Sequence, residues 1–302
     1  MRIGLNLPHY GSLTSPEAVA GVSRAAETLG YDSLWTGDRL LSPLAPSDRY
    51  PGGDGTMPAE MTTYLDPLTA LAFAAAGTSR IRLGTSTLNA PWYPPVLLAR
   101  TLTTLDVLSR GRLEVGLGLG WSRDEYTATG VPWRDRGARL DEIIDVLEAV
   151  WGAGVVGHEG ARFRVPDSRI EPKPVQRPRP PILLAGLRPE ATARIARRAD
   201  GWLAVGLPLP YLGSLWDKIR SEAEAYGRDP AALRMVQRLN PRLTSTPADP
   251  ARVPATGTLE QIAQYAKAAA ADEVFIDLTL TVTRQDEMLD LAGRFLELMR
   301  AG

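Results

Sequence analysis

The chain repeats one pattern along its length: a short apolar run typical of a buried β-strand, followed by a longer stretch rich in alanine and leucine. Eight such runs occur in the 302 residues, at 2–7, 33–36, 81–86, 113–117, 182–185, 202–205, 234–239 and 273–278. Strands that alternate with helices are typical of βαβ units and of a parallel sheet. The sequence therefore predicts an α/β protein whose eight strands close into a single (β/α)8 TIM barrel.

The helical stretches carry their own signals. Before the first one, Ser15 supplies an N-cap, Pro16 a first-position proline and Glu17 an early acid, and Gly30 closes the same segment. The helices predicted in this way are 16–29, 66–76, 95–108, 139–151, 189–199, 212–226, 259–271 and 285–299. Each of them follows one of the predicted strands.

Two proline-rich stretches, 42–61 and 152–181, do not fit the repeat. Proline disfavours helix interiors and central strands, so both are expected to be loop insertions. The first follows strand two and should lie over the C-terminal mouth of the barrel, whereas the second precedes strand five and should wrap the outside. No linker divides the chain, so residues 1–302 are expected to form one domain.

Composition excludes several classes of function. The 34 basic and 35 acidic residues leave a net charge of −1, which argues against a nucleic-acid partner. There is no cysteine, and the three lysines and two histidines form no metal-ligand or Schiff-base pattern, so no metal is expected. Neither a signal peptide nor a run of 18 apolar residues is present, which predicts a cytoplasmic protein without membrane attachment.

In a barrel of this kind the active site forms from the residues that follow the strands. These candidates are His9, Tyr10, Asp38, Arg39, Ser86, Thr87, Asn89, Gly118, Gly120, Trp121, Asp124, Glu125, Gly186, Arg188, Gly206, Gln237, Asn240 and Asp277. The glycines at 116, 118 and 120 do not complete a dinucleotide fingerprint, because Trp121 and Arg123 stand where its third glycine would fall. They either let a flat ligand approach the backbone or simply allow a tight turn.

Several segments in a fixed order resemble one family. They are Ile3-Gly-Leu-Asn-Leu-Pro, Tyr31-Asp-Ser-Leu-Trp-Thr-Gly-Asp38, Ile81-Arg-Leu-Gly-Thr-Ser86-Thr-Leu, Leu105-Asp-Val-Leu-Ser-Arg-Gly-Arg-Leu, Gly118-Leu-Gly-Trp121 with Glu125-Tyr126, Pro181-Ile-Leu-Leu-Ala-Gly and Ala199-Asp-Gly-Trp202. Over roughly residues 1 to 300 the chain resembles the luciferase-like flavin monooxygenases and their deazaflavin relatives. The resemblance implies a barrel that binds coenzyme F420 or reduced FMN at its mouth, with hydride or oxygen chemistry at the ring.

Carried over position by position, the resemblance implies specific roles. Asp38 matches the cofactor-facing acid after strand two, and Ser86-Thr87 matches the end of strand three, where related proteins hold a non-proline cis peptide. The remaining implied cofactor-binding residues are Asn89, Gly120, Trp121, Asp124, Ala185, Gly186, Leu187 and Arg188. The catalytic candidates are Asp38, Arg39 and His9, although His9 could instead only cap the turn after strand one.

Three departures from the family pattern matter. Arg39 stands where histidine is frequent, so a neutral imidazole is not available there, and Arg39 could instead pair with an anionic substrate or the reduced cofactor. Trp121 replaces the acid of the sugar-phosphate dehydrogenases of the family, which argues against that activity. Leu187 and Arg188 replace a phosphate-cradling glycine pair, so backbone amides of the helix near Pro189, with Arg188, would hold the phosphate.

The leading hypothesis is an oxidoreductase that uses coenzyme F420 to move a hydride to or from a small organic substrate. An FMN-dependent monooxygenase with a separate reductase is the close alternative, and a non-catalytic flavin-binding barrel is a further one. An unrelated barrel that acts on phosphorylated compounds is the least favoured of these hypotheses. By resemblance alone a homodimer is expected.

Overall fold

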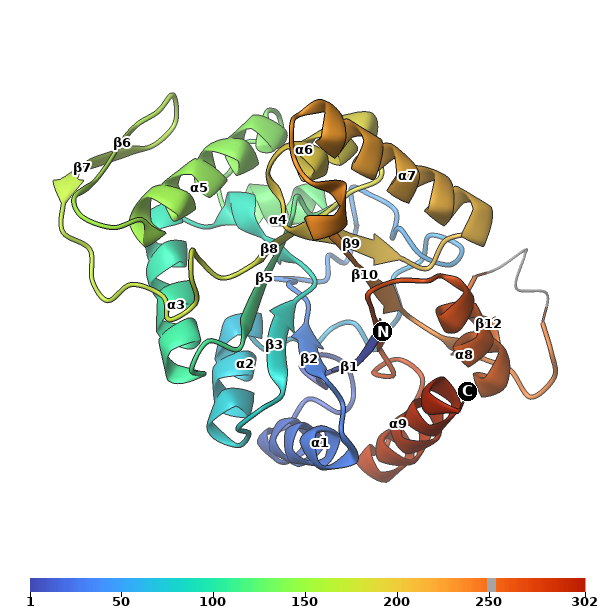
Figure 1. Ribbon diagram of the computed structural model, residues 1–302. Helices are drawn as coiled ribbons and strands as arrows, with labels where there is room; N and C mark the ends of the chain where they lie inside the picture. The colour runs from blue at the N-terminus through green and yellow to red at the C-terminus, as the bar shows by residue number, and fades with distance from the viewer. Residues whose placement is uncertain (249–253, 302) are drawn as a thin grey trace.

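A closed barrel of eight parallel strands forms the centre of the molecule (Figure 1). The structure is a computed structural model and describes residues 1–248 and 254–301. The barrel strands are β1 (Arg2–Asn6), β2 (Ser33–Thr36), β3 (Arg82–Thr85), β5 (Leu113–Gly118), β8 (Ile182–Ala185), β9 (Gly201–Val205), β10 (Arg234–Leu239) and β13 (Glu273–Ile276). The eight predicted strands are confirmed, with ends that differ by two residues at most.

The strand order is β3-β2-β1-β13-β10-β9-β8-β5, and pairing of β3 with β5 closes the ring. All of these pairs are parallel, and the closing pair aligns Leu83 with Leu113 and Gly84 with Glu114. A two-residue strand, β4 (Leu88–Asn89), extends the edge of β5 beyond β3. The TIM barrel predicted from the sequence is therefore confirmed.

Helices surround the barrel on its outer face (Figure 1). They are α1 (Pro16–Leu29), α2 (Pro67–Ala76), α3 (Pro95–Leu108), α5 (Arg136–Trp151), α6 (Pro189–Arg198), α7 (Leu209–Ala225), α8 (Leu259–Ala268) and α9 (Gln285–Arg300). The predicted caps of α1 are present, because the Ser15 hydroxyl accepts a hydrogen bond from the Ala18 N–H and Gly30 adopts a left-handed conformation with φ +95°. A short helix after β5, α4 (Arg123–Ala128), was not predicted.

The barrel interior is filled by large side chains. Trp35 stacks on Phe275 with ring centroids 4.8 Å apart, and both rings are buried. Gly84 makes room for this pair, because a Cβ atom there would lie 2.4 Å from the Trp35 ring. Since the interior is packed, ligands can reach the barrel only at its ends.

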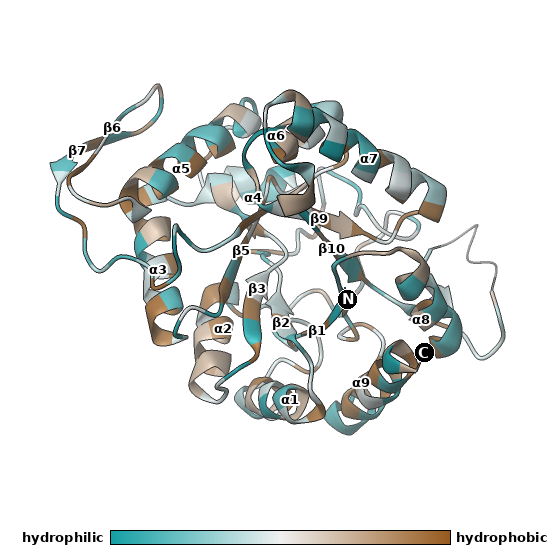
Figure 2. Cartoon of the chain, in the orientation of Figure 1, coloured by the Kyte–Doolittle hydropathy of each residue, from teal (hydrophilic) through white to brown (hydrophobic). Residues whose placement is uncertain are grey.

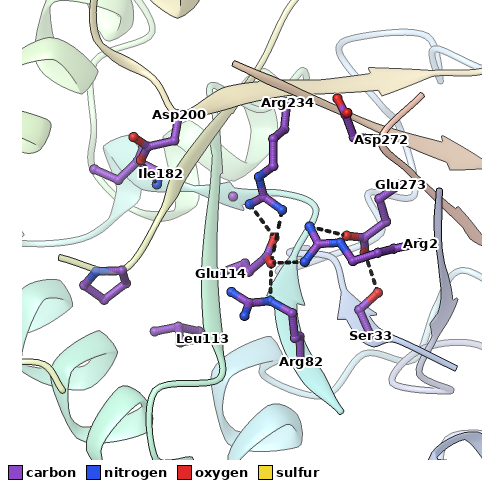
Figure 3. Close-up of polar contacts among 12 residues, drawn as sticks. Arg2, Ser33, Arg82, Leu113, Glu114, Ile182, Asp200, Arg234, Asp272 and Glu273 are labelled. Carbon is purple, nitrogen blue, oxygen red and sulfur yellow. Dashed lines mark hydrogen bonds and ion pairs between the residues drawn. The ribbon is translucent and has the colours of Figure 1, made fainter. Parts of the chain in front are cut away.

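Five charged side chains close the end of the barrel at which the strands begin (Figure 3). Glu114 accepts from Arg2 at 3.3 Å, from Arg234 at 3.1 Å and from the Nε atom of Arg82. Arg2 also pairs with Glu273 at 2.8 Å. Both glutamates are fully buried, whereas the three arginine side chains are about one-quarter to one-third exposed (26–32%). This cluster, which we call the basal charge cluster, leaves the opposite end of the barrel for a functional site.

The two insertions lie where the sequence predicted them. Residues 42–61 reach the C-terminal mouth, because both the N–H and the hydroxyl of Ser47 donate to Asp124, which follows β5 (2.9 and 2.7 Å). The segment 152–181 lies at the periphery beside α5 (Figure 1). It contains an antiparallel hairpin, β6 (Val156–Glu159) and β7 (Arg164–Ser168), which the sequence pattern did not predict.

Candidate functional site

The carboxyl group of Asp38 is buried at the C-terminal mouth, directly after β2. Its Oδ2 atom accepts hydrogen bonds from the Asn89 N–H (3.0 Å) and from the Tyr93 hydroxyl (2.9 Å). The side-chain amide of Asn89 donates in turn to the Asp38 carbonyl (3.0 Å). Burial raises the pKa of Asp38 to about 7, although the bonds from Asn89 and Tyr93 lower it. At neutral pH the carboxyl group is therefore poised between its two protonation states, which suits proton transfer.

Sequence reasoning missed Tyr93, which fixes one oxygen of Asp38. The residue lies beyond the end of β4, after the short 3₁₀ turn η1 (Ala90–Trp92), and no strand or helix periodicity places it. Desolvation and the neighbouring Asp38 raise the pKa of Tyr93 far above its ordinary value, so it stays a hydrogen-bond donor.

His9 is fully enclosed at the end of β1. Its Nε2 atom accepts from the Gly37 N–H (2.8 Å), and its Nδ1 atom then carries the proton that it donates to the Leu7 carbonyl (2.8 Å). Burial lowers the pKa of His9 to about 4, so the ring is uncharged at neutral pH. Since both ring nitrogens are engaged with the backbone, the geometry matches the turn-capping alternative and ties the ends of β1 and β2 together.

Arg39 lies against its own chain. Its Nε atom is 3.3 Å from the Glu125 carboxylate, its Nη2 atom donates to the Leu41 carbonyl (3.1 Å), and its guanidinium carbon lies 4.4 Å above the Trp121 ring. The Arg39 side chain is only 9% exposed. Burial raises the pKa of Glu125, and Arg39 opposes that rise. The Glu125 carboxylate of the same chain thus lies beside Arg39, whose Nη1 atom has no hydrogen-bond partner among the described residues.

A second buried ion pair crosses the mouth from the opposite side. Arg238 at the end of β10 pairs with Asp277, donates to the Ser86 carbonyl (2.9 Å) and donates to the Asn240 side chain (3.0 Å). Tyr10 donates to the same Asp277 carboxylate (2.7 Å). Burial would raise the pKa of Asp277, but Arg238 and these hydrogen bonds hold it below its ordinary value.

On β10 the sequence pattern indicated Gln237 as a site residue and not Arg238. Gln237 points away from the mouth and donates to the Tyr265 hydroxyl on α8 (3.1 Å). Val236 belongs to the barrel interior, and side chains alternate along a strand, so Arg238 faces the same side as Val236. That alternation was the signal that would have identified Arg238.

The implied cofactor-binding positions line the rim between β3 and β8. The Ser86–Thr87 peptide bond is cis, as the resemblance implied. Gly118 is required there, because a Cβ atom would lie 2.5 Å from the Thr87 hydroxyl oxygen. Gly120 has φ +68° and faces Asn89 and Trp92. Between Ser86 and Gly120 this rim therefore combines bare backbone with small polar groups.

The remaining predicted residues divide between loop anchoring and the start of α6. Asp124 binds Ser47 of the insertion, and Trp121 meets the Tyr50 ring edge-on at 5.7 Å. Gly186 follows β8 with φ +148°, and its carbonyl accepts from Trp202 (3.1 Å). Ala185, Leu187 and Arg188 complete this turn, in which Leu187 and Arg188 are exposed and α6 begins at Pro189.

Two hollows open at the mouth. One has a volume of about 320 Å³ and is lined in part by Asp38, Leu40, Leu65 and Asp66. The other has a volume of about 340 Å³ and lies by Tyr10 and Asp277, with Asn240, Pro241, Arg242, Leu243, Leu280 and Thr281. Both are of the size of small-molecule sites.

The fold is a TIM barrel with a buried, titratable carboxyl group at its mouth. Comparison with known proteins identifies the family of enzymes to which such a chain belongs. The chain belongs to the luciferase-like monooxygenase family, whose model matches residues 2–297. Membership of this family makes the chain an oxidoreductase.

Two relatives illustrate the family. An uncharacterized protein of Mycobacterium tuberculosis is 34% identical over 222 residues, which cover 69% of this chain and 78% of the relative. A phthiodiolone/phenolphthiodiolone dimycocerosates ketoreductase of the same organism is 30% identical over 218 residues, covering 69% of this chain and 56% of the relative.

Solved structures agree on the fold. A monooxygenase from Streptomyces bottropensis has a TM-score of 0.78 at 23% identity, covering 98% of this chain and 99% of the other. An F420-dependent secondary alcohol dehydrogenase has a TM-score of 0.79 at 16% identity, covering 99% of both chains. In the described part of the chain no helix is long and apolar enough to cross a membrane.

Proposed function

We propose that this chain uses coenzyme F420 to transfer a hydride between the cofactor and the carbonyl or alcohol carbon of a small organic substrate. The observation that carries the proposal is the Asp38 carboxyl group, buried at the mouth with a pKa raised to about 7. A hydride added to a carbonyl carbon requires a proton at its oxygen, and a group that titrates near neutral pH supplies it best. The similar F420-dependent alcohol dehydrogenase and the ketoreductase relative favour this reaction.

The residues of the mouth fit a flat ring with a phosphate-bearing tail. The Trp92 indole N–H is buried without an acceptor among the described residues, and its ring lies 3.4 Å from where a Cβ atom at Gly120 would stand. This unpartnered donor beside bare backbone suits the polar edge of a deazaflavin. The turn at Gly186 and the Glu190 N–H at the start of α6 would hold the phosphate, with Arg188 adding charge.

When bound, the reduced deazaflavin supplies the hydride, which carries two electrons, and is left oxidised. Asp38 in its protonated form gives its proton to the oxygen of the carbonyl substrate, which becomes a hydroxyl group, and accepts that proton back in the reverse direction. Asn89 and Tyr93 both hold Oδ2, so Oδ1 is the oxygen that faces the substrate in this proposal. The loop 42–61, with Tyr50 against Trp121, limits the access of water.

The first test is titration of the purified protein with F420 and with FMN, each oxidised and reduced, followed by fluorescence and absorbance. We expect tighter binding of F420. Tighter binding of FMN would instead favour a two-component monooxygenase with a partner reductase, and oxygen consumption during turnover would support it. Binding of neither cofactor would overturn the mechanism.

The second test is Asp38→Asn, which keeps the size of the side chain but cannot give or take the proton. We expect turnover to fall by about 10²- to 10⁴-fold while F420 affinity changes little. Asp54→Asn, at an exposed loop position, is the matched control and should leave turnover unchanged. Unchanged turnover in Asp38→Asn would remove the proposed role of Asp38, and tight F420 binding without turnover of any substrate by the unmodified chain would favour the non-catalytic alternative.

We also propose that the chain forms a homodimer through α2 and α3. Figure 2 shows α2 in brown and white along most of its length, without the broad hydrophilic side of α6 and α8. Phe73 on α2 and Leu97 on α3 are each 50% exposed. Sedimentation velocity of the purified chain, and of Phe73→Glu, would test this pairing, because the variant should sediment as a monomer.

A further inference from the structure

The mouth of the barrel neutralises its own buried cations. Arg39 lies beside Glu125 and Arg238 is paired with Asp277, so a carboxylate of the same chain already balances each guanidinium charge, although the Nη1 atom of Arg39 has no hydrogen-bond partner among the described residues. The hollow beside the proposed catalytic carboxyl group is lined by Asp38 and Asp66 as well as by Arg39. A phosphate or carboxylate in this hollow would lose its hydration and face two acidic side chains.

The same mouth exposes large apolar side chains on loops that follow four different strands. Leu44 on the loop after β2 is fully exposed, and the others are between 37% and 47% exposed. They are Leu40 and Leu65 after β2, Leu187 after β8, Val205 at the end of β9 and Leu280 after β13. Leu40 and Leu65 line the hollow of Asp38, and Leu280 lines the hollow of Asp277. These three leucines therefore place apolar surface directly beside the carboxyl groups of the mouth, where it can contact a bound ligand.

We infer that the site takes an uncharged substrate with an extended apolar part, which lies on these leucines while its single polar group meets Asp38. The inference rests on the proposed function, because it assigns the substrate class of that same site. Two further observations favour a small molecule over a protein partner. Leu40, Leu65 and Leu280 line hollows of about 320 and 340 Å³, and one of these hollows contains the proposed catalytic carboxyl group.

Besides Arg39, whose charge Glu125 balances, Arg242 is the other cationic residue among those that line the two hollows. It lines the hollow of Asp277 and its side chain is exposed to water. An ion pair at such a position is screened and contributes little to affinity. We therefore expect Arg242→Ala to leave the preference between charged and uncharged substrates unchanged.

The experiment measures ligand binding to the complex with oxidised F420 by calorimetry and ligand-observed NMR. The probes are 2-butanone, 2-hexanone and 2-octanone, together with 7-oxooctanoate and 8-amino-2-octanone, which place a negative or a positive charge at the far end of the C8 chain. We expect affinity to rise about fourfold for each added methylene group. Both charged ketones should bind at least tenfold more weakly than 2-octanone.

A variant and a matched control locate the surface. Leu65→Asp should weaken 2-octanone binding at least tenfold without changing F420 affinity, because Leu65 borders the Asp38 hollow. Val155→Asp is the matched control, because it also replaces an exposed apolar side chain by an acidic one but lies on the segment before the peripheral hairpin. It should change neither 2-octanone binding nor F420 affinity.

The outcomes separate the two proposals. Failure of F420 to bind refutes the proposed function, whatever the ketones do. Tight F420 binding together with affinity that is independent of chain length, or with 7-oxooctanoate bound as well as 2-octanone, overturns the substrate class alone. Stronger binding of the amino ketone would overturn it as well and would point to an attractive role for Asp38 and Asp66.

Discussion

Replacing Asp38 by asparagine should stabilise the folded chain, and more so as the pH rises. The folded-state pKa is about 7, whereas an unfolded aspartate titrates near pH 3.9. The stability that the protonated carboxyl group contributes is therefore fully present below about pH 4 and is lost as the pH rises to 7, because the unfolded state releases the proton first. The asparagine of the variant would not titrate, and its side-chain oxygen can still accept from Asn89 and Tyr93.

The magnitude follows from the difference between the two pKa values. At 1.36 kcal/mol per unit, the full pKa difference of about three units corresponds to about 4 kcal/mol. Part of this stability is already lost at pH 5, so between pH 5 and pH 8 the wild-type chain should lose about 3 kcal/mol relative to Asp38→Asn. At about 2 °C per kcal/mol for a chain of this size, the gain in melting temperature of the variant should be about 6 °C larger at pH 8 than at pH 5.

Scanning calorimetry of both proteins at pH 5, 6, 7 and 8 would measure this gain. Asp54→Asn is the control: its carboxylate is exposed and its pKa is lowered by the Thr56 N–H, so no gain should develop with rising pH. Tyr93→Phe removes one donor to the Asp38 carboxylate and should raise its pKa further, by about one unit. A difference between wild type and Asp38→Asn that stays the same from pH 5 to pH 8 would refute the reasoning.

Two further predictions concern the framework. Glu114→Gln should lower the melting temperature by about 6 °C, because breaking a buried ion pair whose arginines are partly hydrated costs about 3 kcal/mol. Glu159→Gln is the control: its ion pair is exposed, and the melting temperature should change by under about 2 °C. Gly116→Ala should prevent recovery of folded protein, because its Cβ atom would lie 1.8 Å from the Thr85 carbonyl oxygen. Gly213→Ala is the control: this residue lies on α7 with open space around it, so the variant should give wild-type yield or slightly higher stability. Normal melting of Gly116→Ala would show that β3 and β5 are packed differently.

The barrel could be predicted because each of its strands and helices is indicated by the residues of its own segment. Apolar runs of four to six residues, separated by capped helices, specify strands and helices without reference to the rest of the chain, as at Ser15 and Gly30. The hairpin at 156–168 has no such signal, since its strands contain His158, Glu159 and Pro166 and most of its residues are not buried. Its position depends on Glu142 of α5, which accepts from the backbone of Arg162.

The candidate site could be predicted in part: the residues that directly follow strands were found, and their hydrogen-bond and ion-pair partners were not. Asp38 and Asn89 follow strands directly, so the topology alone brings them to one rim. The partners that set their properties come from elsewhere: Tyr93 arrives through a turn, and Glu125 reaches Arg39 from the helix after β5. Such pairings become visible only when the closed ring fixes which strand ends face each other.

Two buried carboxyl groups, Glu114 at the base of the barrel and Asp38 at its mouth, lie in opposite electrostatic environments. At the base, Glu114 is surrounded by Arg2, Arg82 and Arg234, an arrangement that compensates its charge and closes the barrel. At the mouth, Asp38 has only neutral donors within hydrogen-bond distance among the described residues, and burial raises its pKa to about 7. Structure alone does not require an uncompensated buried acid, because asparagine would fill the same space with less penalty. Proton transfer requires a carboxyl group that titrates near neutral pH beside a hollow large enough for a substrate, and Asp38 meets both conditions. The same uncompensated burial lowers the stability of the folded chain, which indicates that the residue serves the reaction and not the fold.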